Sequence, residues 1–304
     1  MEAVKKLSIS TNESGQRLDN FLRKKLKNIP KSLLYKIIRD GQVRVNMRRK
    51  QPSYRIQHDD IIRIPPLNEK QHSTENQTNI SDLITKNIIF EDKDLLVLNK
   101  PSGIAVHSGT NIKTNIINLL RDIANYKDIT LVHRIDKYTS GCLILAKNYK
   151  TASAIGNLFI NKEVSKKYIA LLAGKIKEKS LYISKPLKKE KVLGIKKMTI
   201  SDDGKEANTE FKVLETYNES TLVEVKITTG RTHQIRAHSA DIGHPICGDI
   251  KYGNNTVNKG FKKIGLNRIF LHSSKISFFY KKKYNFIANI PSDLRNILDT
   301  INEN

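Results

Sequence analysis

A single carboxylate, Asp136, lies among cationic residues in the segment LVHRIDKYTSGCLILAK at 131–147. Arg134 and Lys137 are its near neighbours, and the apolar run CLILA at 142–146 follows. An acid beside cations stays ionised, and carboxylates in such charged surroundings gather at functional sites. We therefore interpret Asp136 as a candidate reacting group.

Two later segments also combine reactive side chains with regular structure. Tyr168 falls on a predicted strand in KKYIALLAGK at 166–175. Arg231, in TGRTHQIRAH at 229–238, comes just ahead of a predicted helix, where backbone N–H groups point outward and favour anions. A joint site with Asp136 requires this loop, this strand and the start of this helix to converge.

Other chemistries use the same residue types. The donors of a metal site would be His133, Asp136, His233 and His238. The last two histidines are five positions apart, which does not place them on one helical face, and the neighbouring arginines would repel a divalent cation. A triad on Ser140 lacks the glycine elbow that presents a nucleophilic serine. A purely structural ion pair between Asp136 and Arg231 is the strongest alternative, because such networks are commoner than active sites.

The composition favours a polyanionic partner. Among 304 residues, 54 Lys and Arg outnumber 30 Asp and Glu, which gives a formal net charge of +24 and a pI near 9.9. Cations placed on phosphates release condensed counterions, so such an excess is typical of nucleic-acid-binding proteins. A lysine-rich organism would raise the total as well, so the distribution of the charge carries more weight than its sum.

The apolar pattern is that of a soluble protein. Apolar residues make up 38% of the chain, and the longest apolar runs are far shorter than the roughly 18 residues that a spanning helix needs. The N-terminal segment has no apolar stretch of the kind that directs secretion. We expect a cytoplasmic protein in which Cys142 and Cys247 are buried reduced thiols, since neither has a CxxC partner.

Charge and polarity divide the chain into three parts. Residues 1–65 carry a net charge of +10, residues 66–82 a net charge of −2, and residues 83–304 a net charge of +16. The middle part, PLNEKQHSTENQTNISD, is almost free of apolar residues and cannot bury enough surface to offset its ordering entropy. It is predicted to be a flexible linker between a small domain at 1–65 and a large domain at 83–304.

The small domain is predicted to contain a helix pair and a small sheet. Leu18, Phe21, Leu22 and Leu26 share one helical face. A second helix, with Ser32 as its cap, should run through Ile38 and stop at Gly41, followed by strands at 42–46 and 60–65. Basic residues remain outside, which also fits an ordinary solvated helix face. The candidate RNA-binding residues are Arg23, Lys24, Lys31, Lys36 and Arg39.

Strand and helix patterns alternate in the large domain, with strands in the majority. Strands are expected on both sides of the EDKD turn in 87–101 and at 142–147, 167–175, 208–217, 220–228 and 271–280. Helices are expected at 150–163, at 231–243 up to Gly243, and at 291–301 with Ser292 as cap. Many strands are consecutive, so we predict an α+β fold with a mixed, mostly antiparallel sheet.

Six segments carry a resemblance to a known family. HRIDKYTSG at 133–141, with the Tyr168 and Arg231 segments in this order, resembles the RluA branch of the pseudouridine synthases, whose signature is HRxDxxTSG. NKPSG at 99–103, GHPICGD at 243–249 and LNRIFLHS at 266–273 match further blocks of that family. Residues 15–65 resemble an S4 domain, a small α/β module that binds structured RNA.

The resemblance implies an isomerase that converts uridine to pseudouridine in RNA without a cofactor or a metal. Asp136 would be the catalytic carboxylate, and Arg231 would pair with it and keep it anionic. Tyr168 would stack under the flipped base and assist removal of the C5 proton. Arg134 would expel the base and fill its place in the stack. Tyr138 departs from the small or acidic residue usual at its position.

With the S4 domain in front, the resemblance points to family members that act on large-subunit ribosomal RNA, and to a monomer. Three alternatives remain open. One is the other S4-containing type of the family, a second is a synthase that acts on transfer or messenger RNA, and a third is a ribosome assembly factor that binds RNA without catalysis. The intact Asp136, Tyr168 and Arg231 argue against the last.

Overall fold

The computed structural model describes residues 4–26, 29, 31–66, 82–107, 115–192 and 194–303. The chain divides into two compact units, Met1–Thr74 and Glu75–Asn304. The division falls inside the predicted linker at 66–82, most of which (67–81) lies outside the described residues. The linker and the limits of the two predicted domains therefore stay predictions.

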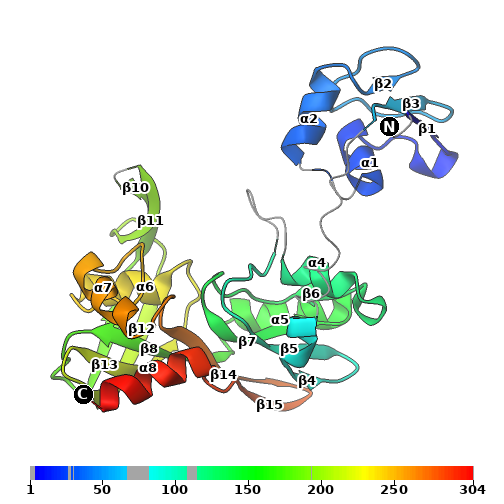
Figure 1. The fold of residues 1–304 in the computed structure, drawn as a ribbon. Coiled ribbons are helices and arrows are strands. Elements are labelled where there is room, and N and C mark those ends of the chain that lie inside the picture. The colour runs from blue at the N-terminus through cyan, green and yellow to red at the C-terminus, as the bar shows by residue number, and fades with distance from the viewer. Residues whose placement is uncertain are drawn as a thin grey trace. The chain divides into compact units, whose positions relative to one another are not determined.

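The first unit is a helix pair on a three-stranded antiparallel sheet of order β1-β3-β2 (Figure 1). Its elements are β1 (Lys5–Ser8), the short 3-10 helix η1 (Thr11–Glu13), α1 (Leu18–Lys25), α2 (Lys31–Arg39), β2 (Arg44–Val45) and β3 (Ile61–Ile64). Leu18, Phe21 and Leu22 of α1 pack with Leu34, Ile37 and Ile38 of α2 in one buried core. The predicted pair of helices and their apolar faces are thus confirmed.

Local details of the first unit differ from the sequence prediction. The second helix begins at Lys31, so Ser32 lies inside its first turn instead of capping it. The predicted strand at 42–46 is only two residues long. β1 was not predicted, because its sequence KKLS has one partly buried apolar residue, Leu7, and no alternating pattern.

Three candidate RNA-binding side chains of this unit are exposed: Arg23, Lys36 and Arg39. The guanidinium of Arg39 lies over the Tyr35 ring, 5.8 Å from its centroid. Lys24 and Lys31 belong to α1 and α2, and the structure describes them by their backbone alone.

The second unit is built on a ten-stranded sheet with the main order β4-β5-β7-β14-β8-β13-β12-β9, with β6 added to β7 and β15 to β14. The strands of this sheet are β4 (Ile88–Glu91), β5 (Leu95–Lys100), β6 (Thr130–Leu131), β7 (Ser140–Ala146), β8 (Ser165–Ala173), β9 (Ser180–Ser184), β12 (Asn208–Thr216), β13 (Ser220–Ile227), β14 (Leu271–Tyr280) and β15 (Lys282–Ile287). Apart from the parallel pair β7–β14, the pairings described in this sheet are antiparallel. The predicted α+β class with a mixed, mostly antiparallel sheet is confirmed.

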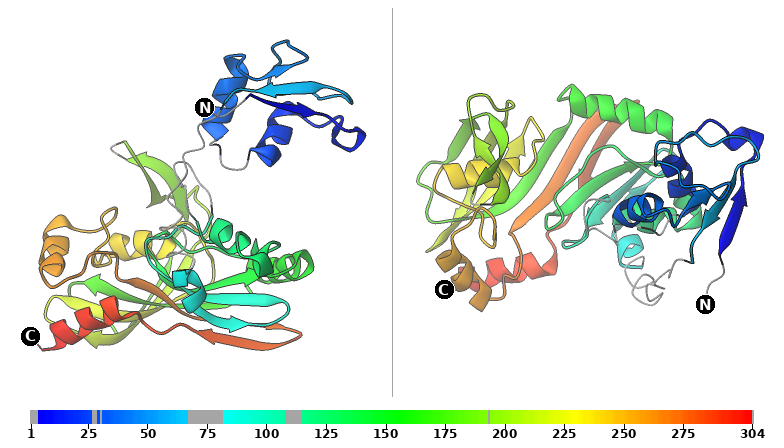
Figure 2. Two further views of the ribbon diagram at one scale, coloured as in Figure 1. Left: turned by 45° about the vertical axis from the view of Figure 1, so that its right-hand side comes forward. Right: turned by 90° about the horizontal axis from the view of Figure 1, so that it is seen from above.

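Helices cover the two halves of this sheet separately. They are α4 (Ile116–Arg121), the 3-10 helix η2 (Ala124–Tyr126), α5 (Tyr149–Ile160), α6 (Gln234–Asp241), α7 (Asn255–Lys263) and α8 (Ser292–Asn302). Figure 1 shows α4 and α5 beside β5 and β7, and α6, α7 and α8 beside β8, β12 and β13. Seen from above in Figure 2, β14 and β15 run between these two groups of helices.

All seven residues of β7 are buried, which explains its unbroken apolar sequence. Leu143 and Leu145 enter the core formed with α4, whereas Cys142 and Ile144 enter the core that contains Ile155 of α5. Such alternation follows from the two-residue period of a strand. Both cysteines of the chain are buried free thiols, as predicted.

Several features of this unit differ from the sequence prediction. The helix α4 and the strands β6 and β9 were not expected, and α6 begins at Gln234 instead of Arg231. β10 (Leu187–Val192) and β11 (Ile195–Ile200) form a separate hairpin that stands out from the unit in Figure 1. Its β10 strand exposes every residue after Leu187, so the expected apolar signal is missing. Similarly, α7 buries only Phe261. The last helix begins at Ser292, with Pro291 in the cap position.

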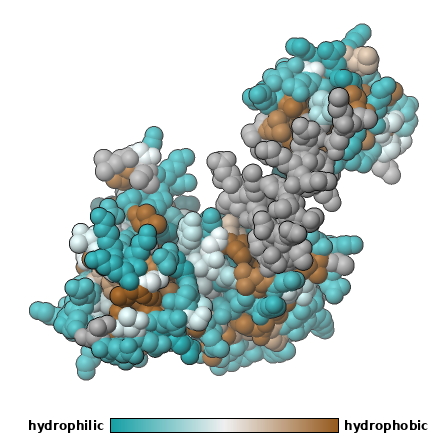
Figure 3. Space-filling view, viewed as in Figure 1, coloured by the Kyte–Doolittle hydropathy of each residue, from teal (hydrophilic) through white to brown (hydrophobic). Residues whose placement is uncertain are grey.

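Hydrophilic residues cover most of the face seen in Figure 3, and hydrophobic residues form small patches. Within the described residues, no helix is long and apolar enough to cross a membrane.

Candidate active site

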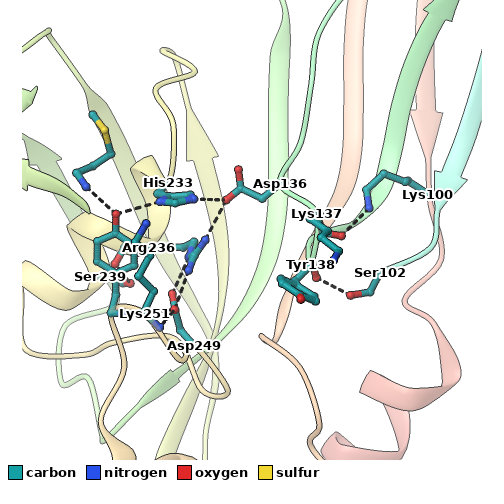
Figure 4. A network of polar contacts seen from close by, with 12 residues as sticks. Lys100, Ser102, Asp136, Lys137, Tyr138, His233, Arg236, Ser239, Asp249 and Lys251 are labelled. Carbon is teal, nitrogen blue, oxygen red and sulfur yellow. Dashed lines mark hydrogen bonds and ion pairs between the residues drawn. The ribbon is translucent and has the colours of Figure 1, made fainter. Parts of the chain in front are cut away.

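The loop that carries Asp136 is fixed by the segment NKPSG at 99–103. The buried Lys100 ammonium donates to the carbonyl oxygens of Pro101, Ile104 and Lys137, with Nζ···O distances of 2.7, 3.0 and 3.1 Å. Ser102 Oγ donates to the carbonyl of Tyr138 at 2.7 Å, as Figure 4 shows. Burial lowers the pKa of Lys100 to about 7, and the three carbonyls match the three N–H bonds of its protonated form.

The end of the same loop is locked against β14. Gly141 has φ of +110°, and a Cβ atom there would lie 2.2 Å from the carbonyl oxygen of Ser273. Ser140 Oγ bonds His272 Nδ1 at 2.9 Å, and the other ring nitrogen of His272 lies 3.0 Å from the carbonyl of Ala288. Ser140 and Gly141, the last two residues of the signature, therefore pair with His272 and Ser273 of β14. The Ser140 hydroxyl has a structural role there, as the partner of His272.

A pocket opens where the Asp136 loop meets the start of α6. Asp136, Tyr168 and Arg231, the three predicted catalytic residues, all line it, and so does Arg134. The other lining residues are Ile135, Thr139, Ile227, Gly230, His233, Gln234, Ile235, Arg236 and Leu271. The predicted loop, strand and helix start thus converge on one pocket.

Asp136 is held by Arg236, in the first turn of α6 (Figure 4). Arg236 Nη1 donates to Asp136 Oδ2 at 3.3 Å, while Nε and Nη2 grip both oxygens of Asp249 at 2.7 and 2.8 Å. The Asp249 side chain is fully buried, and its Oδ1 also accepts from the backbone N–H groups of Lys251 and Tyr252. The buried carboxylate of Asp249 therefore fixes the Arg236 side chain, which in turn bonds the partly exposed carboxylate of Asp136.

The two oxygens of Asp136 have different surroundings. Oδ2 faces Arg236 Nη1 and, at 3.7 Å, His233 Nε2. Oδ1 makes no hydrogen bond within the part of the chain that the structure describes. The side chain is 26% exposed and lines the pocket, so the carboxylate has one anchored and one available oxygen.

His233 contributes no charge to this arrangement at neutral pH. Burial lowers the pKa of its ring to about 4, against the raising effect of Asp136. Its backbone is left-handed, with φ of 53°, directly before the first residue of α6. The charge on Asp136 is therefore balanced by Arg236, and His233 approaches it as a neutral ring.

The predicted pairing of Arg231 with Asp136 is wrong. The Arg231 side chain donates through Nε to the carbonyl oxygen of Glu206 at 2.9 Å, and its backbone N–H donates to Gln234 Oε1 at 3.0 Å. Arg231 belongs to the turn before α6, whereas Arg236 lies on the helix beyond the left-handed residue His233. The change of chain direction at His233 brings the later arginine to the carboxylate.

Tyr168 and Arg134 occupy contrasting positions in the pocket. Tyr168 is 8% exposed, and burial raises the pKa of its phenol above the ordinary value. The phenol is therefore protonated at neutral pH. Arg134 is exposed, and its Nη1 lies 3.4 Å from His107 Nε2. Tyr168 is therefore a buried wall of the pocket, and Arg134 is an exposed cation of its lining.

His133 and His238, the other two histidines considered as metal ligands, have structural roles. His133 Nε2 accepts the backbone N–H of Ile144 at 2.9 Å, and its ring stacks on Phe159. His238 is buried between Thr209 Oγ1 and the carbonyl of Lys185. Within the described ranges, no three His, Cys, Asp or Glu side chains gather as a metal site would require.

The prediction missed Lys100, Arg236, Asp249 and Tyr252 as parts of the site. The first three lie inside segments whose order already indicated the family: NKPSG, TGRTHQIRAH and GHPICGD. Residue types in these segments could not show whether Arg231 or Arg236, five positions apart, would bond Asp136. An Asp in a Gly-rich turn also gives no sign that it will be buried against one of them.

Comparison with known proteins identifies both units. The model of the family described as RNA pseudouridylate synthase matches residues 94–241, and the S4 domain model matches residues 16–62. The chain is 41% identical over 310 residues to the "Ribosomal large subunit pseudouridine synthase C" of Pasteurella multocida, covering 99% of this chain and 95% of that protein. It is 40% identical to the protein of the same name from Buchnera aphidicola subsp. Schizaphis graminum, with 98% of each covered.

Solved structures agree with this relationship. The human RNA pseudouridylate synthase domain containing 4 is 25% identical, with a TM-score of 0.63 over 75% of this chain and 97% of that one. The human RNA pseudouridylate synthase domain containing 1 is 27% identical, with a TM-score of 0.58 over 67% of this chain and 83% of that one. The chain belongs to the RNA pseudouridylate synthase family, as an RNA pseudouridine synthase of the RluA branch with an N-terminal S4 domain.

Proposed function

We propose that this enzyme converts uridines to pseudouridines in RNA of the large ribosomal subunit, with Asp136 as its catalytic carboxylate. The substrate class is supported by the names of the two bacterial relatives, which match nearly the whole chain at 40 and 41% identity. The catalytic role is carried by one observation: Asp136 presents an unbonded oxygen to the pocket while Arg236 holds the other.

The reaction needs few groups from the protein. Uridine and pseudouridine are isomers: the N1–C1′ bond breaks, the uracil ring turns, and C5 bonds to C1′. The C5 proton leaves and N1 gains one, so the balance needs no oxidant, reductant or leaving group. A carboxylate beside the anomeric carbon serves such chemistry. Attack of Asp136 Oδ1 on C1′ and removal of the C2′ proton are both open to it.

Arg236 keeps Asp136 ready for either step. Its guanidinium is always charged and is itself fixed by the buried Asp249. A rigid arginine therefore provides a defined direction for Oδ1.

Arg134 and Tyr168 are proposed to handle the base. A uridine within folded RNA must leave its stack to reach such a pocket, and the exposed Arg134 is positioned at the rim to take its place. Tyr168 is proposed to stack against the inserted uracil. Because burial raises the pKa of its phenol, Tyr168 can act on the C5 proton only after a separate base accepts its own.

The S4 unit is proposed to add affinity through phosphate contacts. Its candidates are Arg23, Lys24, Lys31, Lys36 and Arg39 on α1 and α2. Such contacts position a protein on RNA without reading sequence. A flexible linker at 66–82 would raise the effective concentration of the synthase unit near its target. Catalysis is proposed to proceed in the cytoplasm, by a monomer.

The test is tritium release from large-subunit ribosomal RNA labelled at uridine C5, with EDTA present and no added cofactor. Wild type should release tritium, and Asp136→Asn should release none above background while its affinity for the RNA stays nearly unchanged. Transfer RNA labelled in the same way serves as the competing substrate.

Release by Asp136→Asn at more than a trace would refute the catalytic role of Asp136. Faster release from transfer RNA would replace the substrate proposed here. Wild-type protein that binds the ribosomal RNA and releases nothing would favour an assembly factor that binds without catalysis.

A further inference from the structure

Tyr252 lies at a junction of three segments behind Asp136. Its hydroxyl accepts the backbone N–H of Met198 in β11 at 2.8 Å and lies 3.0 Å from His233 Nδ1. Its backbone N–H donates to Asp249 Oδ1. Its ring meets the His233 ring edge-on at 5.5 Å and has the Arg236 guanidinium 5.0 Å from its centroid. Figure 4 labels His233, Arg236 and Asp249, the residues around which these contacts gather.

These contacts determine which nitrogen of His233 carries the proton. The Tyr252 oxygen already accepts from Met198, so its own hydrogen is available for a further bond. Within the described residues, His233 Nδ1 is the acceptor in reach of that hydrogen. With Nδ1 accepting, the neutral ring carries its hydrogen on Nε2, the nitrogen that faces Asp136 Oδ2 at 3.7 Å.

The opposite tautomer is disfavoured on both sides of the ring. A hydrogen on Nδ1 would point at the Tyr252 oxygen and leave the hydroxyl hydrogen without a described partner. The bare Nε2 lone pair would then face a carboxylate, which only accepts hydrogen bonds. The hydrogen bond from Tyr252 and the negative charge of Asp136 therefore both favour the tautomer of His233 that carries its hydrogen on Nε2.

We propose that Tyr252 and His233 are positioning residues, which direct a neutral Nε2–H toward Asp136 Oδ2 and so leave Oδ1 to the substrate. The inference rests on the proposed role of Asp136. Arg236 Nη1 donates to this oxygen at 3.3 Å, and His233 Nε2 lies 3.7 Å from it, too far for a hydrogen bond but close enough for its N–H dipole to attract the carboxylate charge. Both interactions favour the orientation of the carboxylate in which Oδ2 faces these two side chains. The left-handed backbone of His233 (φ 53°) is what brings its ring to this place.

The first test is Tyr252→Phe, which removes the hydroxyl and keeps the ring under Arg236. Without the bond from Tyr252 to His233 Nδ1, the Nε2–H of His233 is no longer directed at Asp136, and Asp136 Oδ1 is less well oriented. We expect kcat to fall by about 10-fold, with KM for RNA within twofold of wild type. A loosened β10–β11 hairpin would instead raise KM. Tyr182→Phe, the same change on the exposed face of β9 (64% exposed), should leave both constants unchanged.

A second readout does not depend on activity. In protein labelled with nitrogen-15 histidine, two-bond proton–nitrogen correlation spectra report the tautomer of each ring. The His233 signals are identified by their loss in His233→Gln. Wild type should show Nε2–H, and Tyr252→Phe should show a shift toward Nδ1–H.

The pair His233→Gln and His233→Met makes the test robust, since both variants bear the same left-handed backbone strain. Gln retains a side-chain N–H donor and should keep most of the wild-type kcat, whereas Met should lose it at equal thermal stability. A hydrogen on Nδ1 of His233 in the wild-type protein, or an equal kcat for His233→Gln and His233→Met, would overturn the proposed positioning role of Tyr252 and His233. Failure of the proposed function is distinguishable, because it would abolish wild-type tritium release and leave the tautomer as inferred.

Discussion

Arg236 serves two carboxylates of unequal exposure. Its Nε and Nη2 form a planar fork on Asp249, whose side chain is fully buried, and Nη1 extends to Asp136, whose side chain is 26% exposed. A lysine could not satisfy both, because its ammonium lacks the fork geometry. One side chain therefore stabilises the fold and holds the candidate catalytic group.

Arg236→Gln should consequently affect activity and stability together. Tritium release should fall by at least about 100-fold, and the free energy of unfolding by about 3 kcal/mol, because Asp249 is left buried and unpaired. Arg231→Gln is the matched control. It should unfold within about 0.5 kcal/mol of wild type and change mainly KM, since Arg231 lines the pocket without contacting either carboxylate.

Equal losses of stability in these two variants in urea unfolding would contradict the assignment of Arg236 as the partner of both carboxylates.

At this scale the sequence predicted which residues line the pocket better than it predicted their contacts. Asp136, Tyr168 and Arg134 line the pocket as expected, because motif order identifies residues by type and position. The partner of Asp136 was missed because it depends on the left-handed turn at His233. Non-glycine residues rarely adopt that conformation, and local sequence gives no sign of it.

Among the elements, the parallel pair β7–β14 positions the Asp136 loop, and His272 fastens it. His272 is fully buried, and burial lowers its pKa below the ordinary value. The ring is ordinarily half-protonated near pH 6.5 in unfolded chains. The unfolded state therefore binds more protons below that pH, and the stability contributed at neutral pH is lost as pH falls through this range.

We expect wild type to lose more unfolding free energy than His272→Gln between about pH 7 and about pH 5, as measured by urea titration at each pH. The other buried histidines titrate in both proteins, so the difference isolates His272. Parallel losses in the two proteins would show that the pKa of His272 does not differ between the folded and unfolded states.

Most of the elements that the sequence predicted have a buried face. The helix α4 was nevertheless missed, although it buries four apolar residues, because its six residues are too few to show a helical period. β7, β8 and α5 have regular apolar periods because they pack on a core. The β10–β11 hairpin and α7 were missed since each is largely exposed. An amphipathic sequence pattern arises when one face of an element is buried. Helices and strands that lie mostly in solvent therefore lack such a pattern and are hard to predict.

At the scale of the whole molecule, the positive charge is divided between the S4 unit and the synthase unit. Substituting Arg23, Lys36 and Arg39 with Gln removes three exposed cations from α1 and α2. If each contacts a phosphate, the slope of log affinity against log salt should become shallower by about 2 to 3. Filter binding to ribosomal RNA over a salt series measures it.

The control removes three exposed lysines from α7, Lys259, Lys262 and Lys263. The net charge changes equally, so a slope that responds equally in both triple variants would show a general charge effect and no special role for the S4 unit.

The junction of β7 with β14 also bears on how the enzyme is made. Ser140 and its partner His272 are 132 positions apart, and contacts of such separation form late in folding. During synthesis, the loop with Asp136 leaves the ribosome long before β14 does. A nascent chain that ends before Leu271 therefore lacks a strand that lines the pocket, and the enzyme should gain activity only after β14 has left the ribosome. A stalled-chain series, released at increasing lengths, would reveal that threshold.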